Sequence, residues 1–218
     1  VAIGNFANEM TALYVTRDNN LQFYDEAVSN GLGSNTRMQL SFSVLFFDAD
    51  LDGRLDLLQT NGHLEEQINK VQASQTYEQA PQLFWNSGPE NETEFVALPA
   101  NKTGDDFLKP LVGRGAAYAD IDNDGDLDLV LTATGQPARL IRNDQQLNHH
   151  WLRVKLTGNG QNLAGIGATI TMSTKGRQQF RTVSPTRGYL SQMELPVTFG
   201  LGDADLVERL TIRWPDGT

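Results

Sequence analysis

Two stretches of the chain repeat one pattern, an acidic turn that leads directly into an apolar run. They are FFDADLDGRLDLLQT at 46–60 and YADIDNDGDLDLVLT at 118–132. Aligning Asp48 with Asp120 gives D-x-D-x-D-G-x-x-D in both copies. Downstream, QLFWNSG (82–88) aligns with RLIRNDQ (139–145), an apolar strand closed by asparagine. Such repetition predicts a fold assembled from one supersecondary unit: a strand, an acidic turn, a second strand and one or two more.

The rest of the chain also has a β signature, because short alternating apolar stretches are separated by Gly, Asn and Asp. Only Leu64–Ser74 has a helical pattern, and we expect it to be a surface insertion between two strands. The fold class is therefore all-β. The expected strands are Ser41–Phe47, Leu55–Thr60, Gln82–Trp85, Gly115–Ala119, Leu127–Thr132, Arg139–Ile141, Trp151–Leu156, Ala168–Met172, Gln178–Val183, Val197–Phe199 and Arg209–Arg213.

A third, eroded copy of the unit opens the chain at Gly4–Thr16. It keeps the strand but has Asn5, Ala7 and Glu9 in place of aspartates, so we expect no ion near Asn5. From about residue 148 the acidic turns stop and glycines become frequent. We therefore expect two domains, the repeats at 1–147 and a small β-rich domain at 148–218.

The aspartates of the two intact turns have the spacing of metal ligands. Calcium takes six to eight oxygen ligands in a flexible geometry, and the glycine at position 6 permits the left-handed backbone needed to wrap an ion. Magnesium requires a stricter octahedron and keeps its waters. An EF-hand is excluded, since position 12 is Gln59 or Leu131 and both follow strand-like residues. The predicted ligands of two Ca²⁺ ions are Asp48, Asp50, Asp52, Asp56 and the Arg54 carbonyl, and Asp120, Asp122, Asp124, Asp128 and the Asp126 carbonyl.

The competing interpretation of these turns is a solvated acidic surface that binds nothing. Four carboxylates in a small volume repel one another unless a cation neutralises them, and a neutral turn would connect the strands without that cost. Calcium is therefore the favoured interpretation.

Charge and composition narrow the function classes. The formal net charge of −10 opposes a nucleic-acid or anionic-membrane surface. The absence of cysteine excludes disulfides, thiolate metal sites and a cysteine nucleophile. No apolar run approaches the roughly 20 residues of a membrane span. The chain begins at Val1 in mid-pattern, and we expect it to be a fragment of a longer protein.

The acidic turns resemble the FG-GAP/VCBS repeats of β-propellers, including the calcium-binding blades of integrin α-subunits. The tail resembles the ASPIC/UnbV domain, through NHHWLRVKL, NLAGIGATI, RGYLSQ, FGLG and RWPDG in that order. The resemblance implies a secreted, periplasmic or cell-surface protein with calcium-bound propeller blades and no established catalytic activity. Three units cannot close a propeller of four to eight blades, so missing blades of the parent chain are expected partners.

Two functional hypotheses follow. The first is a calcium-stabilised, non-enzymatic binding, adhesion or scaffold module with a glycan or protein ligand. The alternative is a polysaccharide hydrolase or lyase, which needs two carboxylates in a cleft with divergent pKa values. Since the clustered aspartates are assigned to metal, its only candidates are Glu65, Glu66 and Glu78 in the insertion.

The remaining polar candidates favour structural roles. His149 and His150 lack further His or Cys at ligand spacing. His63 suits an inter-blade hydrogen bond better than a catalytic base. Ser191 lacks the nucleophile-elbow glycines. Arg187 and Tyr189 are the best exposed candidates for ligand contact, although a turn fixed by Gly188 is the favoured interpretation.

Overall fold

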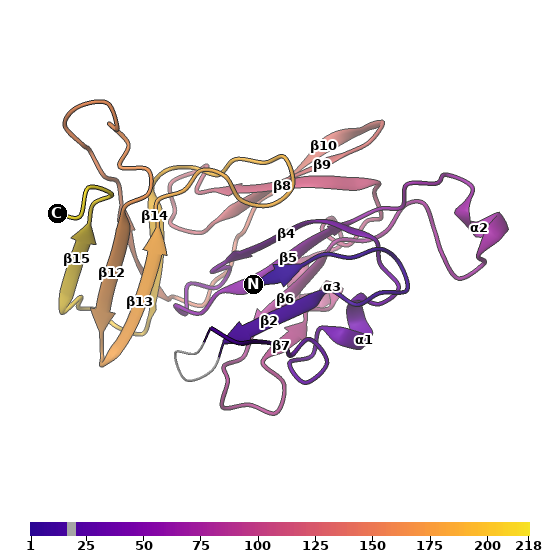
Figure 1. Ribbon diagram of the computed structural model, residues 1–218, viewed down its shortest axis with the longest axis horizontal. Helices are drawn as coiled ribbons and strands as arrows, with labels where there is room; N and C mark the ends of the chain where they lie inside the picture. Colours follow the sequence, from indigo (N-terminus) through magenta and orange to yellow (C-terminus); the bar gives the residue numbers. More distant parts are fainter. Residues whose placement is uncertain (17–20) are drawn as a thin grey trace.

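A computed structural model describes residues 1–16 and 21–218 and shows a chain built almost entirely from short antiparallel strands. The strands form two lobes, an N-terminal one of three meander sheets and a smaller C-terminal one (Figure 1). The all-β prediction is confirmed at this level.

Each sheet of the N-terminal lobe follows chain order, as the repeat predicts. The first contains β1 (Ala2–Ile3), β2 (Ala12–Thr16) and β3 (Phe23–Asp25). The second contains β4 (Ser41–Phe47), β5 (Asp56–Asn61), β6 (Gln82–Asn86) and β7 (Phe95–Ala97). The third contains β8 (Gly113–Ala119), β9 (Asp128–Ala133) and β10 (Gln136–Ile141). The two acidic turns connect β4 to β5 and β8 to β9.

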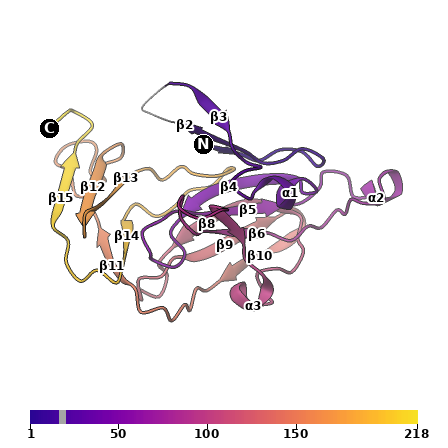
Figure 2. The same cartoon turned by 90° about the horizontal axis from the view of Figure 1, so that it is seen from below.

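The second sheet lies between the other two, and alternation along β4 explains why (Figure 2). Successive strand residues point to opposite faces. Leu45 and Phe47 therefore enter a core shared with the third sheet, whereas Val44 and Phe46 pack on a core shared with the first. The core residues that come from the neighbouring sheets include Leu129 and Leu131 on the third and Leu13 on the first.

The C-terminal lobe has a core of its own. In it β11 (His150–Val154) pairs with β14 (Val197–Gly202), and β12 (Thr169–Thr174) lies between β13 (Arg177–Thr182) and β15 (Arg209–Arg213). The core is made of Leu156, Ala168, Ile170, Met172, Val183 and Phe199, and Trp214 packs against it. The boundary near residue 148 stays a prediction.

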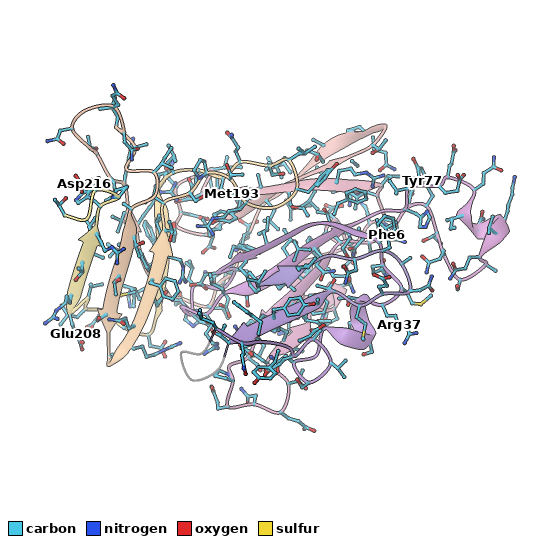
Figure 3. The ribbon with its side chains drawn as sticks, viewed as in Figure 1. Phe6, Arg37, Tyr77, Met193, Glu208 and Asp216 are labelled. Carbon is cyan, nitrogen blue, oxygen red and sulfur yellow. The ribbon has the colours of Figure 1, made fainter. Side chains whose placement is uncertain are left out.

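A long loop of the C-terminal lobe reaches back over the third sheet. Figure 3 shows Met193 at this junction, with Glu208 and Asp216 at the far end of the lobe. The Met193 side chain is buried in the core between the second and third sheets. The two lobes therefore share packed surface.

All the expected strands occur, with ends shifted by at most a few residues. The sequence reading missed β1, β3 and β7, which are only two or three residues long, and the short helices α1 (Gly33–Thr36) and α3 (Ala100–Thr103). The helical insertion is real but shorter than expected, since α2 covers only Ile68–Val71. Among the described residues, no helix is long and apolar enough to cross a membrane.

Candidate metal centres

The loop between β4 and β5 gathers carboxylates at one point. Single oxygens of Asp48, Asp50 and Asp56 lie within 4.8 Å of one another. The loop bends this sharply because Gly53 has φ +91° and Leu51 has φ +60°. The left-handed glycine predicted at position 6 is confirmed. We call this loop centre 1.

The loop between β8 and β9 also gathers three carboxylates, at positions 1, 3 and 5 of the loop, whereas the first loop gathers those at positions 1, 3 and 9. Oxygens of Asp120, Asp122 and Asp124 lie within 4.8 Å of one another. Gly125 has φ +100° and Asn123 has φ +64°, at the same two positions as in centre 1. Similar φ values at these two positions show that the two turns bend in the same way. We call this loop centre 2.

The first aspartate of each loop has one carboxylate oxygen without a hydrogen-bond partner among the described residues. Asp48 Oδ1 and Asp120 Oδ1 are buried, and neither has a hydrogen-bond partner among the described residues. Asp48 is 2% exposed and Asp120 is 7% exposed. A buried carboxylate oxygen without a partner is costly, and a cation beside it removes that cost. These residues therefore fit a bound metal ion, and an all-oxygen set of this kind suits a hard cation.

Several predicted ligands have other partners. Asp52 pairs with the Arg54 guanidinium and accepts the Arg54 main-chain N–H. Asp126 accepts a hydrogen bond from Gln145 Nε2 at 2.7 Å. Asp52 and Asp128 lie outside the two oxygen clusters. Their role as ligands, and that of the Arg54 and Asp126 carbonyls, stays a prediction.

Burial sets the protonation of centre 1 when no metal is bound. Desolvation raises the pKa of Asp48 to about 7, and the neighbouring Asp52 charge adds to the shift. Desolvation also raises the pKa of Asp56 to about 8, against the opposing effect of two main-chain hydrogen bonds. At centre 2, desolvation raises the pKa values of Asp124 and Asp126. Both centres therefore bind protons in competition with a cation.

The C-terminal lobe contacts both centres, which the sequence reading did not anticipate. The Gly200 N–H donates to Asp48 Oδ2 at 3.2 Å, and Arg153 pairs with Asp120 Oδ2 at 3.2 Å. Gly200 lies in the FGLG motif, which the sequence analysis uses only for the resemblance of the tail. A glycine inside a strand is the sequence signal that could have indicated a close approach of another backbone.

The histidines have structural contacts. His149 Nδ1 lies 2.5 Å from the Asp50 carbonyl oxygen, which joins the start of the C-terminal lobe to centre 1. His63 Nδ1 accepts the N–H of Glu65, a local bond rather than the expected inter-blade one. The link between sheets at this point comes instead from Arg114, which donates to the carbonyls of Gly62 and His63.

The loop that carries Arg187 and Tyr189 docks on the N-terminal lobe. Gly188 has φ +67°, as the turn interpretation predicts. The Tyr189 N–H donates to Ser43 Oγ at 3.2 Å, and its ring meets Phe42 edge-on. Ser191 Oγ donates to the Tyr189 carbonyl. The candidate enzyme glutamates, Glu65, Glu66 and Glu78, are all exposed on the insertion.

Comparison with known proteins finds a family match for most of the tail. Residues 158–218 match the family model described as ASPIC and UnbV. Over 108 residues, 48% of this chain, it is 33% identical to cartilage acidic protein 1 of Homo sapiens and 34% identical to that of Xenopus tropicalis. The chain spans only 16% of the length of either relative. The resemblance of the tail to the ASPIC and UnbV family is thereby confirmed.

Proposed function

We propose that this chain is a calcium-stabilised, non-enzymatic binding, adhesion or scaffold module of a secreted, periplasmic or cell-surface protein. The observation that carries the proposal is the pair of buried oxygens, Asp48 Oδ1 and Asp120 Oδ1, that have no partner among the described residues. They lie at the same position of two loops that share one backbone conformation. One orphaned oxygen can be accidental, but its recurrence at the equivalent atom favours a common ligand.

The chemistry of the loops favours calcium over other cations. Every side chain offered is a carboxylate, whereas zinc is usually bound by Cys and His. Carboxylates at different loop positions in the two centres suit the variable coordination of calcium better than the strict octahedron of magnesium. When bound, calcium supplies charge neutralisation and a link between the strands on either side of each loop.

The sheets support a propeller assignment. The second sheet is a four-stranded antiparallel meander lying between two others, which is the form and stacking of a propeller blade. We assign the three meanders to FG-GAP/VCBS blades, with further blades of a parent chain as partners.

A glycan or protein is the proposed ligand, and a half-open cavity beside centre 1 is the place we assign to it. The cavity has a volume of about 480 Å³. Half-buried Trp85 lies in its wall together with Asp50, Asp52 and Arg177. An aromatic face beside hydrogen-bonding groups suits a polar ligand with an apolar side, such as a sugar ring.

Calorimetric titration with calcium, together with thermal unfolding in calcium and in EDTA, tests the proposal. If each site has a dissociation constant of about 0.1 mM, then about 1 mM calcium adds about 1.4 kcal/mol per site. Two sites would raise the melting temperature by about 5–10 °C. The expected stoichiometry is two ions, falling to one in Asp48→Asn and in Asp120→Asn. No heat and no change in melting temperature would contradict the metal assignment.

Screening a glycan panel tests the ligand assignment. We expect retention without turnover, and weaker retention in Trp85→Ala. Released product would favour the polysaccharide-enzyme alternative instead.

A further inference from the structure

At centre 1, the C-terminal lobe fixes the aspartate that carries the free oxygen. Asp48 Oδ2 accepts the N–H of Gly53 at 2.9 Å and the N–H of Gly200 at 3.2 Å. One donor belongs to the loop and the other to β14, so the carboxylate is clamped between the lobes. Its second oxygen, Oδ1, is thereby left for the cation. The Gly202 N–H strengthens the clamp by donating to the Leu51 carbonyl at 2.9 Å.

At centre 2, different residues of the same lobe have the same effect. Arg153 on β11 pairs with Asp120 Oδ2, and Glu194 Oε1 accepts the Asp120 N–H at 3.3 Å. Arg153 and Glu194 also pair with each other. Asp120 Oδ1 again remains free. Two unrelated sets of contacts therefore produce one result at equivalent atoms.

Steric fit also joins the lobe to both loops. A Cβ added at Gly200 would overlap Asp48 Oδ2 and the Leu51 backbone. A Cβ added at Gly125 would overlap the Trp151 ring of β11. Gly53 faces the Gly200 carbonyl, which a Cβ would approach to 3.0 Å. The loops and the lobe therefore pack without spare room.

From these contacts we infer that the C-terminal lobe supplies the outer shell of both metal centres, so that metal binding and lobe docking form one coupled equilibrium. The inference rests on the proposed function and adds Gly200, Arg153 and Glu194 as positioning residues. Outer-shell partners orient ligands, and their loss typically lowers metal affinity about 10- to 100-fold. The coupling is reciprocal, so the ion must also tighten the docking of the lobe.

Terbium, an oxygen-seeking calcium surrogate, reads the two centres separately in the full chain. Trp85 donates Nε1–H to Asp50 Oδ2 at 2.8 Å, so its excitation sensitises terbium at centre 1. Trp151 packs on Gly125 and sensitises centre 2. A Trp151→Phe background therefore reports centre 1 alone, and a Trp85→Phe background reports centre 2 alone.

Gly200→Ala is the decisive variant, because its methyl group presses on centre 1 without removing a ligand. We expect terbium affinity at centre 1 to fall about tenfold or more, with a smaller fall at centre 2, which is coupled to centre 1 through the same lobe. Gly176→Ala is the matched control. It lies in the turn between β12 and β13 of the same lobe and is strained by its φ of +72°, but its methyl group would meet no atom within 4 Å. It should lower stability and leave terbium affinity unchanged.

Hydrogen exchange of the wild-type chain provides a second measurement that does not depend on the folding of a variant. Calcium should slow exchange in β14 and β11, while β15, which pairs on the far side of the lobe, changes little. Protection confined to residues 48–56 and 120–128 would overturn the inference.

The outcomes separate the two proposals. If the wild-type chain gives no EDTA-sensitive terbium emission, both the proposed function and this inference are overturned. A normal wild-type titration, with Gly200→Ala unchanged or Gly176→Ala equally weakened, would overturn the inference alone.

Discussion

Asp56 and Asp128 occupy the ninth position of their loops and accept equivalent pairs of main-chain hydrogen bonds. In each residue one oxygen accepts a hydrogen bond from the main-chain N–H of the loop's second residue, at 2.9 Å for Asp56 and 3.0 Å for Asp128. The other oxygen takes the N–H of Asn86 or Asn143, at 2.8 Å in both cases. These two asparagines close the aligned apolar strands of the repeat. The ninth-position aspartate therefore holds the hairpin together even without metal, whereas the first-position aspartate keeps an oxygen free.

This difference predicts opposite effects of two substitutions at centre 1. Asp56→Ala leaves two buried N–H groups without partners, at about 1–3 kcal/mol each, so the free energy of unfolding should fall by about 2–4 kcal/mol in EDTA. Asp48→Asn removes a buried charge and should change stability little in EDTA, while it abolishes the part of the calcium-dependent stability that centre 1 contributes. Urea unfolding in EDTA and in calcium measures both. Equal losses in EDTA would contradict the division of roles.

The fall of stability with rising pH should be present without metal and should flatten when metal is bound. The pKa of Asp48 is raised to about 7 and that of Asp56 to about 8, both by desolvation, from an unfolded value of 3.8. The metal-free native state therefore binds more protons than the unfolded state between about pH 4 and pH 8, and its stability should fall as pH rises through that window. Calcium displaces those protons, so its stabilising effect should grow over the same range.

Melting temperatures from pH 5 to pH 8, with and without calcium, check this prediction. The exposed groups with lowered pKa values, Asp106 and Asp216, act below pH 3.8 and do not interfere. Calorimetry in two buffers of different ionisation enthalpy should reveal proton release on calcium binding. Metal-free stability that rises toward pH 8 would be inconsistent with these pKa shifts.

A double-mutant cycle tests the packing of Trp151 on Gly125. Gly125→Ala combines a φ of +100° with steric overlap, and we expect it to cost about 2–3 kcal/mol. In a Trp151→Ala background the same change should cost about 1 kcal/mol less, since the overlap is gone. Gly135→Ala has a φ of +67° with no atom within 4 Å, so it isolates the backbone cost. Additive losses would show that the ring and the loop do not press on each other.

Arg153→Met tests the ion pairs at centre 2. The substitution leaves Asp120 and Glu194 without their shared cation in a largely buried site, and we expect a loss of about 2–4 kcal/mol in EDTA. Calcium should recover part of that loss because it neutralises Asp120. Lys109→Met removes an exposed pairing with Asp106 and should change stability little in either condition. A loss for Arg153→Met that calcium leaves unchanged would argue against a link between this pair and the metal.

The sequence predicts the turn conformation of both loops because that geometry is local. An aspartate at positions 1, 3 and 5, with a glycine at position 6, defines the loop within nine residues of chain. The alternation along Ser41–Phe47 likewise predicts β4 to the residue. Resemblance of the tail motifs predicted the family match at 158–218.

The missed features depend on tertiary contact. β3 has only three residues, all exposed, so no burial pattern marks it. The bond from Gly200 to Asp48 joins residues 152 positions apart, and no local spacing encodes it. The role of Asp56 was also hidden, since its partner Asn86 follows only after the insertion that carries α2.

The central claim is that the free oxygens of Asp48 and Asp120 each face a bound calcium ion. Anomalous diffraction from crystals of this chain grown in calcium tests it most directly. The account predicts two peaks, each about 2.3–2.6 Å from one of these oxygens. Loops of unchanged conformation with no peak beside either oxygen would contradict it.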